Sequence, residues 1–267
     1  MTPAYLHGYS SRESGRLHDQ ADTLVDLLHG DTTYPPGSVV LEAGCGVGAQ
    51  TVTLAQRSPA ARFTAIDIAA ASAAETARRV RAARLPNVEV RQADLFTAPF
   101  EPESFDHVFV CFVLEHLAQP ADALARLRTL VRPAGTVTVI EGDHGSAYFH
   151  PDSSAARAVV QCQVELQRRA GADANIGRRL YPLLTGAGFG AVRVSPRTVY
   201  VDGSRPDLAE GFTRRTFTAM LEGVQDAAIA AGLSTRDAFA AGVRDLCRTA
   251  DPDGTFCYTF FKGVGTR

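Results

Sequence analysis

Residues 38–50 read Ser-Val-Val-Leu-Glu-Ala-Gly-Cys-Gly-Val-Gly-Ala-Gln, and this stretch decides the fold. Residues 39–41 are a short apolar run of the kind found in a strand that is buried on both faces. The glycines at positions 44, 46 and 48 predict a turn in which no Cβ atom keeps a ligand away from the backbone. Residues 51–55 then read as the first turns of a helix. A strand, a glycine turn and a helix in this order are typical of the nucleotide-binding element of a doubly wound sheet.

The glycine pattern alone leaves other interpretations open. Gly44, Gly46 and Ala49 also satisfy the G-x-G-x-x-G/A pattern of nicotinamide and flavin enzymes. A tight turn that binds nothing would contain the same glycines. The rest of the chain has to decide between these interpretations.

The composition narrows the class of protein. With 267 residues, of which 45% are hydrophobic, the chain can bury the core of one large α/β domain. The net charge is −2 and no basic stretch is clustered, so we expect neither nucleic acid nor a membrane as partner. No segment reaches the ~18 apolar residues of a membrane span, and the N-terminus lacks a signal-peptide pattern. The five cysteines are scattered and never spaced C-x-x-C, which favours a cytoplasmic protein without zinc.

Strands and helices alternate through the first 141 residues. After the strand at 39–41, we expect strands at 62–66, 88–91, 105–110 and 135–141, with helices at 71–84 and 120–131. Strict alternation predicts a parallel sheet with helices on both faces.

The rest of the chain is predicted to be mostly helical. We expect a loop at 143–150, helices at 153–170, 176–188, 205–232 and 234–249, and strands at 191–201 and 255–262. An amphipathic helix is also expected at 10–29. Because no repeat or linker is present, residues 1–267 are expected to form a single domain. Its parts would be an N-terminal lid and helix (1–30), a cofactor-binding core (38–141) and acceptor-site helices (142–180 and 203–250).

An acidic residue follows the second strand at the position that a nucleotide would need. Asp67 stands 19 residues after Gly48, at the end of the strand at 62–66. An acid about 20 residues past such a turn can accept both ribose hydroxyls of an adenosine ligand. The alternative is a surface Asp without a role.

Five motifs in this order resemble the class I S-adenosylmethionine-dependent methyltransferases. They are Glu-Ala-Gly-Cys-Gly-Val-Gly at 42–48, Asp67, Ala-Asp-Leu at 93–95, Phe105-Asp106 with Leu-Glu-His-Leu at 114–117, and Leu-Val-Arg-Pro-Ala-Gly at 130–135. Within that class the chain is most similar to the small-molecule group related to ubiquinone/menaquinone C-methyltransferases. Residues 5–21 resemble the lid segment of bacterial natural-product methyltransferases.

The resemblance implies an α/β fold, namely a Rossmann-like, doubly wound, seven-stranded and mostly parallel sheet. Its last strand would be antiparallel and lie between the fifth and sixth strands. An N-terminal lid and a helical insertion after strand five would complete the domain.

The resemblance also implies where S-adenosylmethionine would bind. Gly44 and Gly46 would lie beside its methionine part, and Asp67 would take the ribose hydroxyls. Asp94 would accept a hydrogen bond from the adenine amino group, and the Leu95 N–H would donate to a ring nitrogen. The remaining expected cofactor contacts are Arg16 or Gln20 at the carboxylate, Cys111 and Phe112 beside the sulfonium, and Tyr9, Glu42 and Ile68.

Methyl transfer to a neutral acceptor needs a group that takes a proton, and histidine is the natural candidate. His7, His116 and His144 stand near predicted strand ends or in the lid. We favour His144 as the base, with Tyr148 or Tyr9 orienting the acceptor. The structural alternatives are a backbone-bonded loop residue for His144 and a turn cap for His116.

We expect no metal ion at this site. Asp143 follows strand five, but the end of strand four lacks the acid of metal-dependent catechol methyltransferases. His144 and His150 without a third clear ligand are poor evidence for zinc.

The acceptor is expected to be a small, aromatic natural product. The aromatic and apolar residues expected to line its pocket are Tyr148, Phe149, Phe212, Phe217 and Met220. Methylation of an electron-rich carbon such as indole C3 is favoured slightly over O- or N-methylation of a phenol, quinone or amine. An NAD-dependent oxidoreductase and a non-catalytic cofactor-binding protein remain as alternatives of another class. The protein is expected to be a monomer or homodimer.

Overall fold

The central strand of the sheet is the one that the glycine sequence predicts. The computed structural model describes residues 23–267. In it, β1 (Val39–Ala43) pairs in parallel with β2 (Arg62–Asp67) on one side and with β4 (Phe105–Cys111) on the other. Val40 and Leu41 are completely buried, as expected for a strand with both faces covered.

The predicted alternation of strands and helices is confirmed in the first half of the described chain. In order, the elements are β1, α2 (Ala49–Arg57), β2, α3 (Ala70–Ala82), β3 (Val88–Gln92), β4, α4 (Pro120–Leu130) and β5 (Val131–His150). Residues 23–29 are helical and end the predicted N-terminal helix. The rest of that helix and of the predicted lid lies in residues 1–22, outside the described residues.

The sheet has seven strands in the order β3-β2-β1-β4-β5-β7-β6. β7 (Thr255–Thr266) lies between β5 and β6 (Gly190–Val201) and is antiparallel to both. This is the Rossmann-like topology that the resemblance implied, including the position of the last strand.

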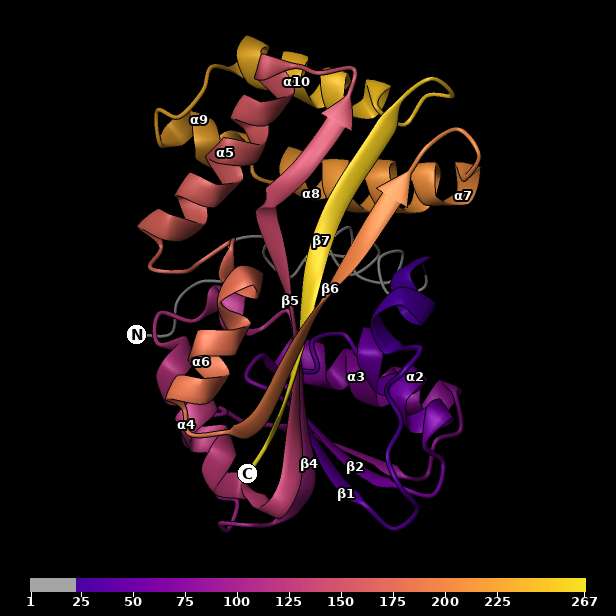
Figure 1. Ribbon diagram of the computed structural model, residues 1–267, viewed down its shortest axis with the longest axis vertical. Helices are drawn as coiled ribbons and strands as arrows, with labels where there is room; N and C mark the ends of the chain where they lie inside the picture. Colours follow the sequence, from indigo (N-terminus) through magenta and orange to yellow (C-terminus); the bar gives the residue numbers. More distant parts are fainter. Residues whose placement is uncertain (1–22) are drawn as a thin grey trace.

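Strand β5 is much longer than predicted. Residues 143–150, which the sequence predicted to be a loop, continue the strand, and residues 148–150 pair with residues 255–257 of β7. The prediction was wrong because Gly142, Gly145 and Ser146 are typical turn residues, whereas pairing with a distant strand decides their conformation. Residues 142–150 thus belong to the sheet. In Figure 1, β5, β7 and β6 run well beyond the ends of the parallel strands.

Helices gather around the extended ends of these three strands, as Figure 1 shows. They are α5 (Ser154–Arg169), α7 (Pro206–Leu208), α8 (Ala219–Glu222), α9 (Gln225–Ala230) and α10 (Arg236–Arg248). α6 (Leu180–Gly186) lies lower, near α4. The sequence predicted one helix over 205–232. The structure divides this stretch into α7, a π-helix (Ala209–Thr218), α8 and α9, with a break at Gly223.

Two hydrophobic cores lie on opposite faces of the sheet. Phe109 and Cys111 of β4 belong to one core, whereas Val108 and Val110 belong to the other. Alternate side chains of a strand point to opposite faces, so the cores are separated by the sheet. The first core continues upward into an aromatic cluster whose ring centroids lie 4.7–6.5 Å apart, formed by Phe212, Phe217, Phe256, Tyr258 and Phe260. This aromatic cluster joins the π-helix to β7.

Candidate functional site

The glycine turn after β1 has the backbone that its sequence requires. Gly44, Gly46 and Gly48 all have positive φ angles, of 79°, 53° and 77°. A Cβ atom on Gly44 would lie 2.4 Å from Cγ2 of Val113, so only glycine fits there. Around Gly46, no atom of residues 23–267 lies within 4 Å of the Cβ position. The turn is therefore closed toward the protein at Gly44 and open at Gly46, where a ligand can approach the backbone.

Asp67 ties the glycine turn to the end of β2. Its Oδ2 atom accepts the N–H of Gly46 at 2.8 Å, and its Oδ1 atom accepts the N–H of Ala69 at 2.9 Å. Burial raises the pKa of this carboxyl, and the two N–H donors oppose that effect. Each carboxylate oxygen has a second lone pair, so Asp67 can still accept hydroxyl donors from a ligand.

The end of β3 lies beside Asp67. The N–H of Ala93 donates to the carbonyl of Asp67, and Oδ1 of Asp94 accepts the N–H of Phe96. Ile68 and Phe96 are large apolar residues that are 41% and 40% exposed. Exposed apolar side chains next to polar acceptors are typical of a site for a flat heterocycle. The sequence prediction included Ile68, Asp94 and Leu95 but missed Phe96.

Glu42, at the end of β1, is a buried acid. Burial and the nearby charge of Asp67 raise its pKa to about 8, although the hydroxyl of Thr51 acts to lower it. Its Oε2 atom is buried and has no hydrogen-bond partner among the described residues. A buried, unpartnered carboxylate oxygen next to an open glycine turn suits a ligand that carries a cationic group.

Cys111 and Phe112, at the end of β4, lie at the same carboxyl edge of the sheet, where open α/β sheets form the crevice for their ligands. Burial raises the pKa of the Cys111 thiol well above its ordinary value, and the carboxylates of Glu141 and Glu42 add to this effect. Phe112 has a φ of 57°, and its N–H donates to the carbonyl of Ile140. Its ring lies 5.4 Å from that of Phe260, so the edge of the aromatic cluster reaches this crevice.

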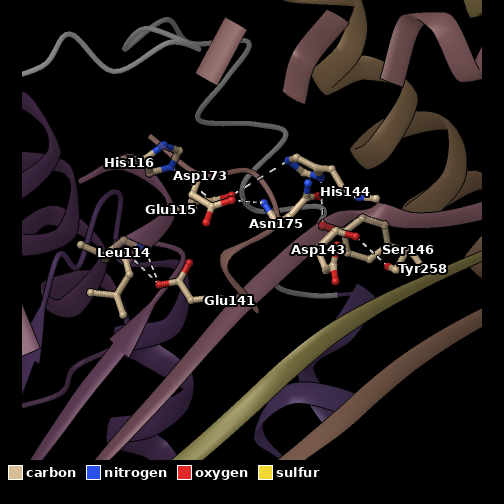
Figure 2. A network of polar contacts seen from close by, with 12 residues as sticks. Leu114, Glu115, His116, Glu141, Asp143, His144, Ser146, Asp173, Asn175 and Tyr258 are labelled. Carbon is tan, nitrogen blue, oxygen red and sulfur yellow. Dashed lines mark hydrogen bonds and ion pairs between the residues drawn. The ribbon is translucent and has the colours of Figure 1, made fainter. Parts of the chain in front are cut away.

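A polar cluster stands where β4 and β5 leave the parallel part of the sheet (Figure 2). Oε1 of Glu115 lies 3.5 Å from Nε2 of His116, and its Oε2 lies 4.0 Å from Nε2 of His144. On the other side of the His144 ring, Nδ1 lies 2.9 Å from the hydroxyl of Tyr258. The four side chains thus form a chain of contacts from His116 to Tyr258.

Backbone contacts hold this polar cluster in place. Oε1 of Glu141 accepts the N–H groups of Val113 and Leu114, at 3.0 and 2.7 Å. The carbonyl of Glu115 accepts the N–H of Asp173. Burial, followed by the neighbouring charge of Glu115, raises the pKa of Glu141 well above its ordinary value. The turn that carries Glu115 and His116 is therefore fixed by a buried acid.

Asp143 is bound to an arginine. The guanidinium of Arg178 donates to both of its carboxylate oxygens, at 2.7 and 2.6 Å. Neighbouring Asn175 accepts the N–H of Gly145. Within residues 23–267, no three His, Cys, Asp or Glu residues gather as ligands of a metal ion would.

The structure brings some of the predicted catalytic residues together and not others. His116 and His144 meet at Glu115, as described above. Tyr148 is 64% exposed, and its hydroxyl contacts Cys257 on β7 rather than the polar cluster. Tyr9, Arg16, Gln20 and His7 lie outside the described residues. Of the predicted pocket residues, Phe212, Phe217 and Met220 are buried in the first core.

Two residues of the polar cluster were not predicted to have a role. Glu115 is part of the Leu-Glu-His-Leu motif, but in this motif only His116 was predicted to take part in proton transfer. Tyr258 lies 114 residues after His144 and meets it only because β7 is inserted beside β5. The alternation of Phe256, Tyr258 and Phe260 in the last strand was the available signal, because it places these rings on one face.

A separate hollow of about 310 Å³ lies at the opposite end of the parallel strands, near Ser38, Asp106 and Arg132. Ligands of open α/β sheets bind at the carboxyl ends of the strands, so this hollow is not the nucleotide site. In the part of the chain that the structure describes, no helix is long and apolar enough to cross a membrane.

Known proteins are similar in sequence to part of the chain. Residues 40–135 match the family model for a methyltransferase domain. An uncharacterised 37.1 kDa protein in transposon TN4556 of Streptomyces fradiae is 38% identical, over 70% of this chain and 54% of that protein. The 2-phytyl-1,4-naphtoquinone methyltransferase of Thermosynechococcus vestitus is 30% identical, over 58% of this chain and 64% of that enzyme. The chain thus spans less than two thirds of the length of these relatives.

Solved structures share the fold. A phosphoethanolamine N-methyltransferase 2 from Haemonchus contortus, in complex with phosphomonomethylethanolamine and S-adenosylhomocysteine, has a TM-score of 0.59. The two sequences are 15% identical, and the likeness covers 97% of this chain and 58% of that one. The glycine turn and Asp67 lie within the matched residues 40–135. Residues 40–135 thus match a methyltransferase domain, and they lie within a seven-stranded Rossmann-like sheet.

Proposed function

We propose that this protein transfers a methyl group from S-adenosylmethionine to a small-molecule acceptor, without a metal ion. One observation carries the proposal most directly. The glycine turn, which is open at Gly46 and held by Asp67, lies at the same edge of the sheet as the Glu115–His144 cluster. This edge of the sheet therefore combines a backbone that suits a nucleotide with groups that can accept a proton.

The cofactor would be held along the ends of β1, β2, β3 and β4. Asp67 would accept the ribose hydroxyls, and Asp94 and the Leu95 N–H would bind the adenine edge. Ile68 and Phe96 would contact the adenine faces, since both are exposed beside these acceptors. The buried oxygen of Glu42 suits the ammonium group of the methionine part. Tyr9, Arg16 and Gln20 would act at the cofactor carboxylate from the N-terminal segment.

The reaction needs alignment and a proton acceptor from the protein. When bound, S-adenosylmethionine supplies a methyl group activated by the neighbouring sulfonium. Cys111 and Phe112 would border this group, and the buried surroundings would keep water away. The proton acceptor would come from the polar cluster of Glu115, His116, His144 and Tyr258, which lies beside the end of β4 and the middle of β5.

The acceptor would be aromatic and without negative charge. Phe112 and Phe260 bring aromatic rings to the crevice, whereas Glu42, Glu115 and Glu141 gather acidic groups there. The charge of Glu115 would repel an anionic acceptor, whereas the raised pKa values of Glu42 and Glu141 favour the neutral form of those two carboxyls. An electron-rich carbon such as indole C3 comes first among the candidates, followed by a phenolic or quinol oxygen and an amine. All five cysteines are free, which suits a reducing compartment such as the cytoplasm.

The direct test is transfer of a radiolabelled methyl group. Purified protein is incubated with labelled S-adenosylmethionine and with separate sets of indoles, phenols and amines, and labelled product and S-adenosylhomocysteine are measured. We expect stoichiometric amounts of both with one set, and none with Asp67→Ala. Absence of S-adenosylhomocysteine with every set would contradict methyl transfer. Reduction of NAD by the same acceptors would instead support a dehydrogenase.

A further inference from the structure

The hydroxyl of Tyr258 is buried between the backbone of Asp143 and the ring of His144. The phenol is buried, and its oxygen receives the backbone N–H of Asp143. Burial and the nearby charges of Glu115 and Asp143 hold the pKa of Tyr258 well above its ordinary value, so the phenol keeps its proton. The hydroxyl is therefore expected to donate to Nδ1 of His144, which lies 2.9 Å from the same oxygen.

This hydrogen bond fixes the tautomer of His144. A neutral imidazole has one N–H and one acceptor nitrogen, and here Nδ1 is the acceptor. The ring proton is therefore on Nε2, which faces Oε2 of Glu115 at 4.0 Å. A nitrogen that already carries a hydrogen cannot take another from a substrate while the ring stays neutral. His144 thus presents an N–H toward Glu115 and an acceptor nitrogen toward Tyr258.

We propose that Glu115 takes the proton of the methyl acceptor, and that Tyr258 and His144 are positioning residues that orient its carboxylate. This inference rests on the proposed function. It replaces His144, the base that the sequence favoured, with the acid next to it.

The position of Glu115 fits this role. Its side chain is 11% exposed, so it is largely shielded from water yet accessible. The imidazole of His116 stands 3.5 Å from its other oxygen. The charge of Glu115 acts on Cys111, at the end of β4, and on Glu141, in the middle of β5. This is the crevice in which the sulfonium of the cofactor would lie, where a carboxylate also favours the positive charge of the reaction.

The reaction combines the transfer of a methyl group with the transfer of a proton, and each transfer breaks one bond and forms one. An electron pair of the acceptor forms the bond to the methyl carbon, while the carbon–sulfur bond breaks and its pair stays on sulfur. The N–H, O–H or ring C–H bond at the reacting atom of the acceptor breaks, and its proton passes to Oε2 of Glu115. The products are the methylated acceptor, S-adenosylhomocysteine and the carboxylic acid form of Glu115, which then releases the proton to water.

Paired substitutions separate the two candidate bases. Glu115→Gln should lower kcat by ~10²–10⁴, the range expected for a lost base. His144→Gln keeps an amide N–H donor that can face Glu115, so we expect a loss of about tenfold or less. Glu165→Gln on α5 removes a surface carboxylate and serves as the matched control, with turnover unchanged. A loss with His144→Gln as large as that with Glu115→Gln would overturn the assignment.

The tautomer can be measured without any turnover. Nitrogen-15 NMR of protein labelled in histidine, with His144→Gln to assign the signal, should show Nε2–H and unprotonated Nδ1. Tyr258→Phe should weaken this preference, because the donor to Nδ1 is removed. Observation of Nδ1–H in the wild type would overturn the inference. If the wild type forms no S-adenosylhomocysteine with any acceptor, the proposed function itself fails, whatever the tautomer.

Discussion

A Cβ atom on Gly142 would lie only 2.4 Å from the hydroxyl oxygen of Tyr258. The two residues face each other across β5 and β7, and the space left by the glycine is filled by the phenol oxygen. The hydrogen bond between Tyr258 and His144 therefore depends on a residue that contributes no side chain.

Gly142→Ala should force the tyrosine hydroxyl aside. We expect a decrease of about 1–3 kcal/mol in the free energy of unfolding, the usual result of overpacking, together with a loss of turnover. In Gly142→Ala/Tyr258→Phe the clashing oxygen is gone, so the double variant should lose less stability than the sum of the two single changes. Urea denaturation measures all three. Gly186→Ala is the control, because no atom in the described part of the chain lies within 4 Å of its Cβ position. Additive losses would show that the clash does not occur.

Arg178→Met should destabilise the protein by roughly 3 kcal/mol, because the buried carboxylate of Asp143 loses both of its guanidinium hydrogen bonds. The carboxylate side chain of Asp143 is only 3% exposed, so water cannot replace the arginine. Thermal or urea denaturation measures the loss. Arg168→Met removes an exposed partner of Glu165 and should cost less than about 1 kcal/mol. Equal losses in the two variants would contradict this account of Asp143.

Stability should fall in mild acid because of His29. Its Nε2 lies 2.5 Å from Oε1 of Gln50, and burial lowers its pKa from 6.5 to about 4. The unfolded chain therefore binds a proton at a higher pH than the folded one. The contribution of neutral His29 to the free energy of unfolding is complete above pH 6.5 and is lost as the pH falls toward 4. Between pH 7 and pH 5 the loss should be about 2 kcal/mol.

Comparison with His29→Gln isolates this effect from the titration of acids. The variant keeps a polar partner for Gln50 and has no ionisable group at position 29. Urea denaturation at pH 7 and pH 5 should show a smaller loss for the variant, by about 2 kcal/mol. If the free energy of unfolding falls equally between pH 7 and pH 5 in the two proteins, His29 is not the titrating group.

Phe96→Ala and Ile68→Ala should weaken binding of S-adenosylmethionine, since both side chains would contact the adenine ring. Loss of an apolar contact of ~1–2 kcal/mol corresponds to an increase in Kd of about 5–30-fold. Stability should change little, because both residues are about 40% exposed. Tyr181→Ala, another exposed ring, on α6, is the control. Unchanged Kd values in the Phe96 and Ile68 variants would place the adenine elsewhere.

Local patterns were enough to predict the parallel half of the fold. Residues 39–48 determine a strand and a turn by their own composition, and the positive φ angles of Gly44, Gly46 and Gly48 agree with it. The extension of β5 could not be predicted in this way. Gly142 and Gly145 favour a turn locally, and only pairing with β7 makes this segment a strand.

The polar cluster was predicted in part for a similar reason. His116 and His144 were recognised by residue type and by their position near strand ends. The roles of their partners depend on contacts across the sheet, above all the one between Tyr258 and Nδ1 of His144. A tautomer is set by the neighbours of each ring nitrogen, and sequence alone does not place those neighbours.

The most direct measurement is calorimetric titration with S-adenosylmethionine and, separately, with NAD, on the wild type and on Asp67→Ala. We expect micromolar binding of S-adenosylmethionine and no binding of NAD. Asp67→Ala should abolish the binding, because it removes both the acceptor for the ribose hydroxyls and the hydrogen bond from the Gly46 N–H. Binding of NAD in place of S-adenosylmethionine, or binding of S-adenosylmethionine that is unaffected by Asp67→Ala, would contradict this prediction.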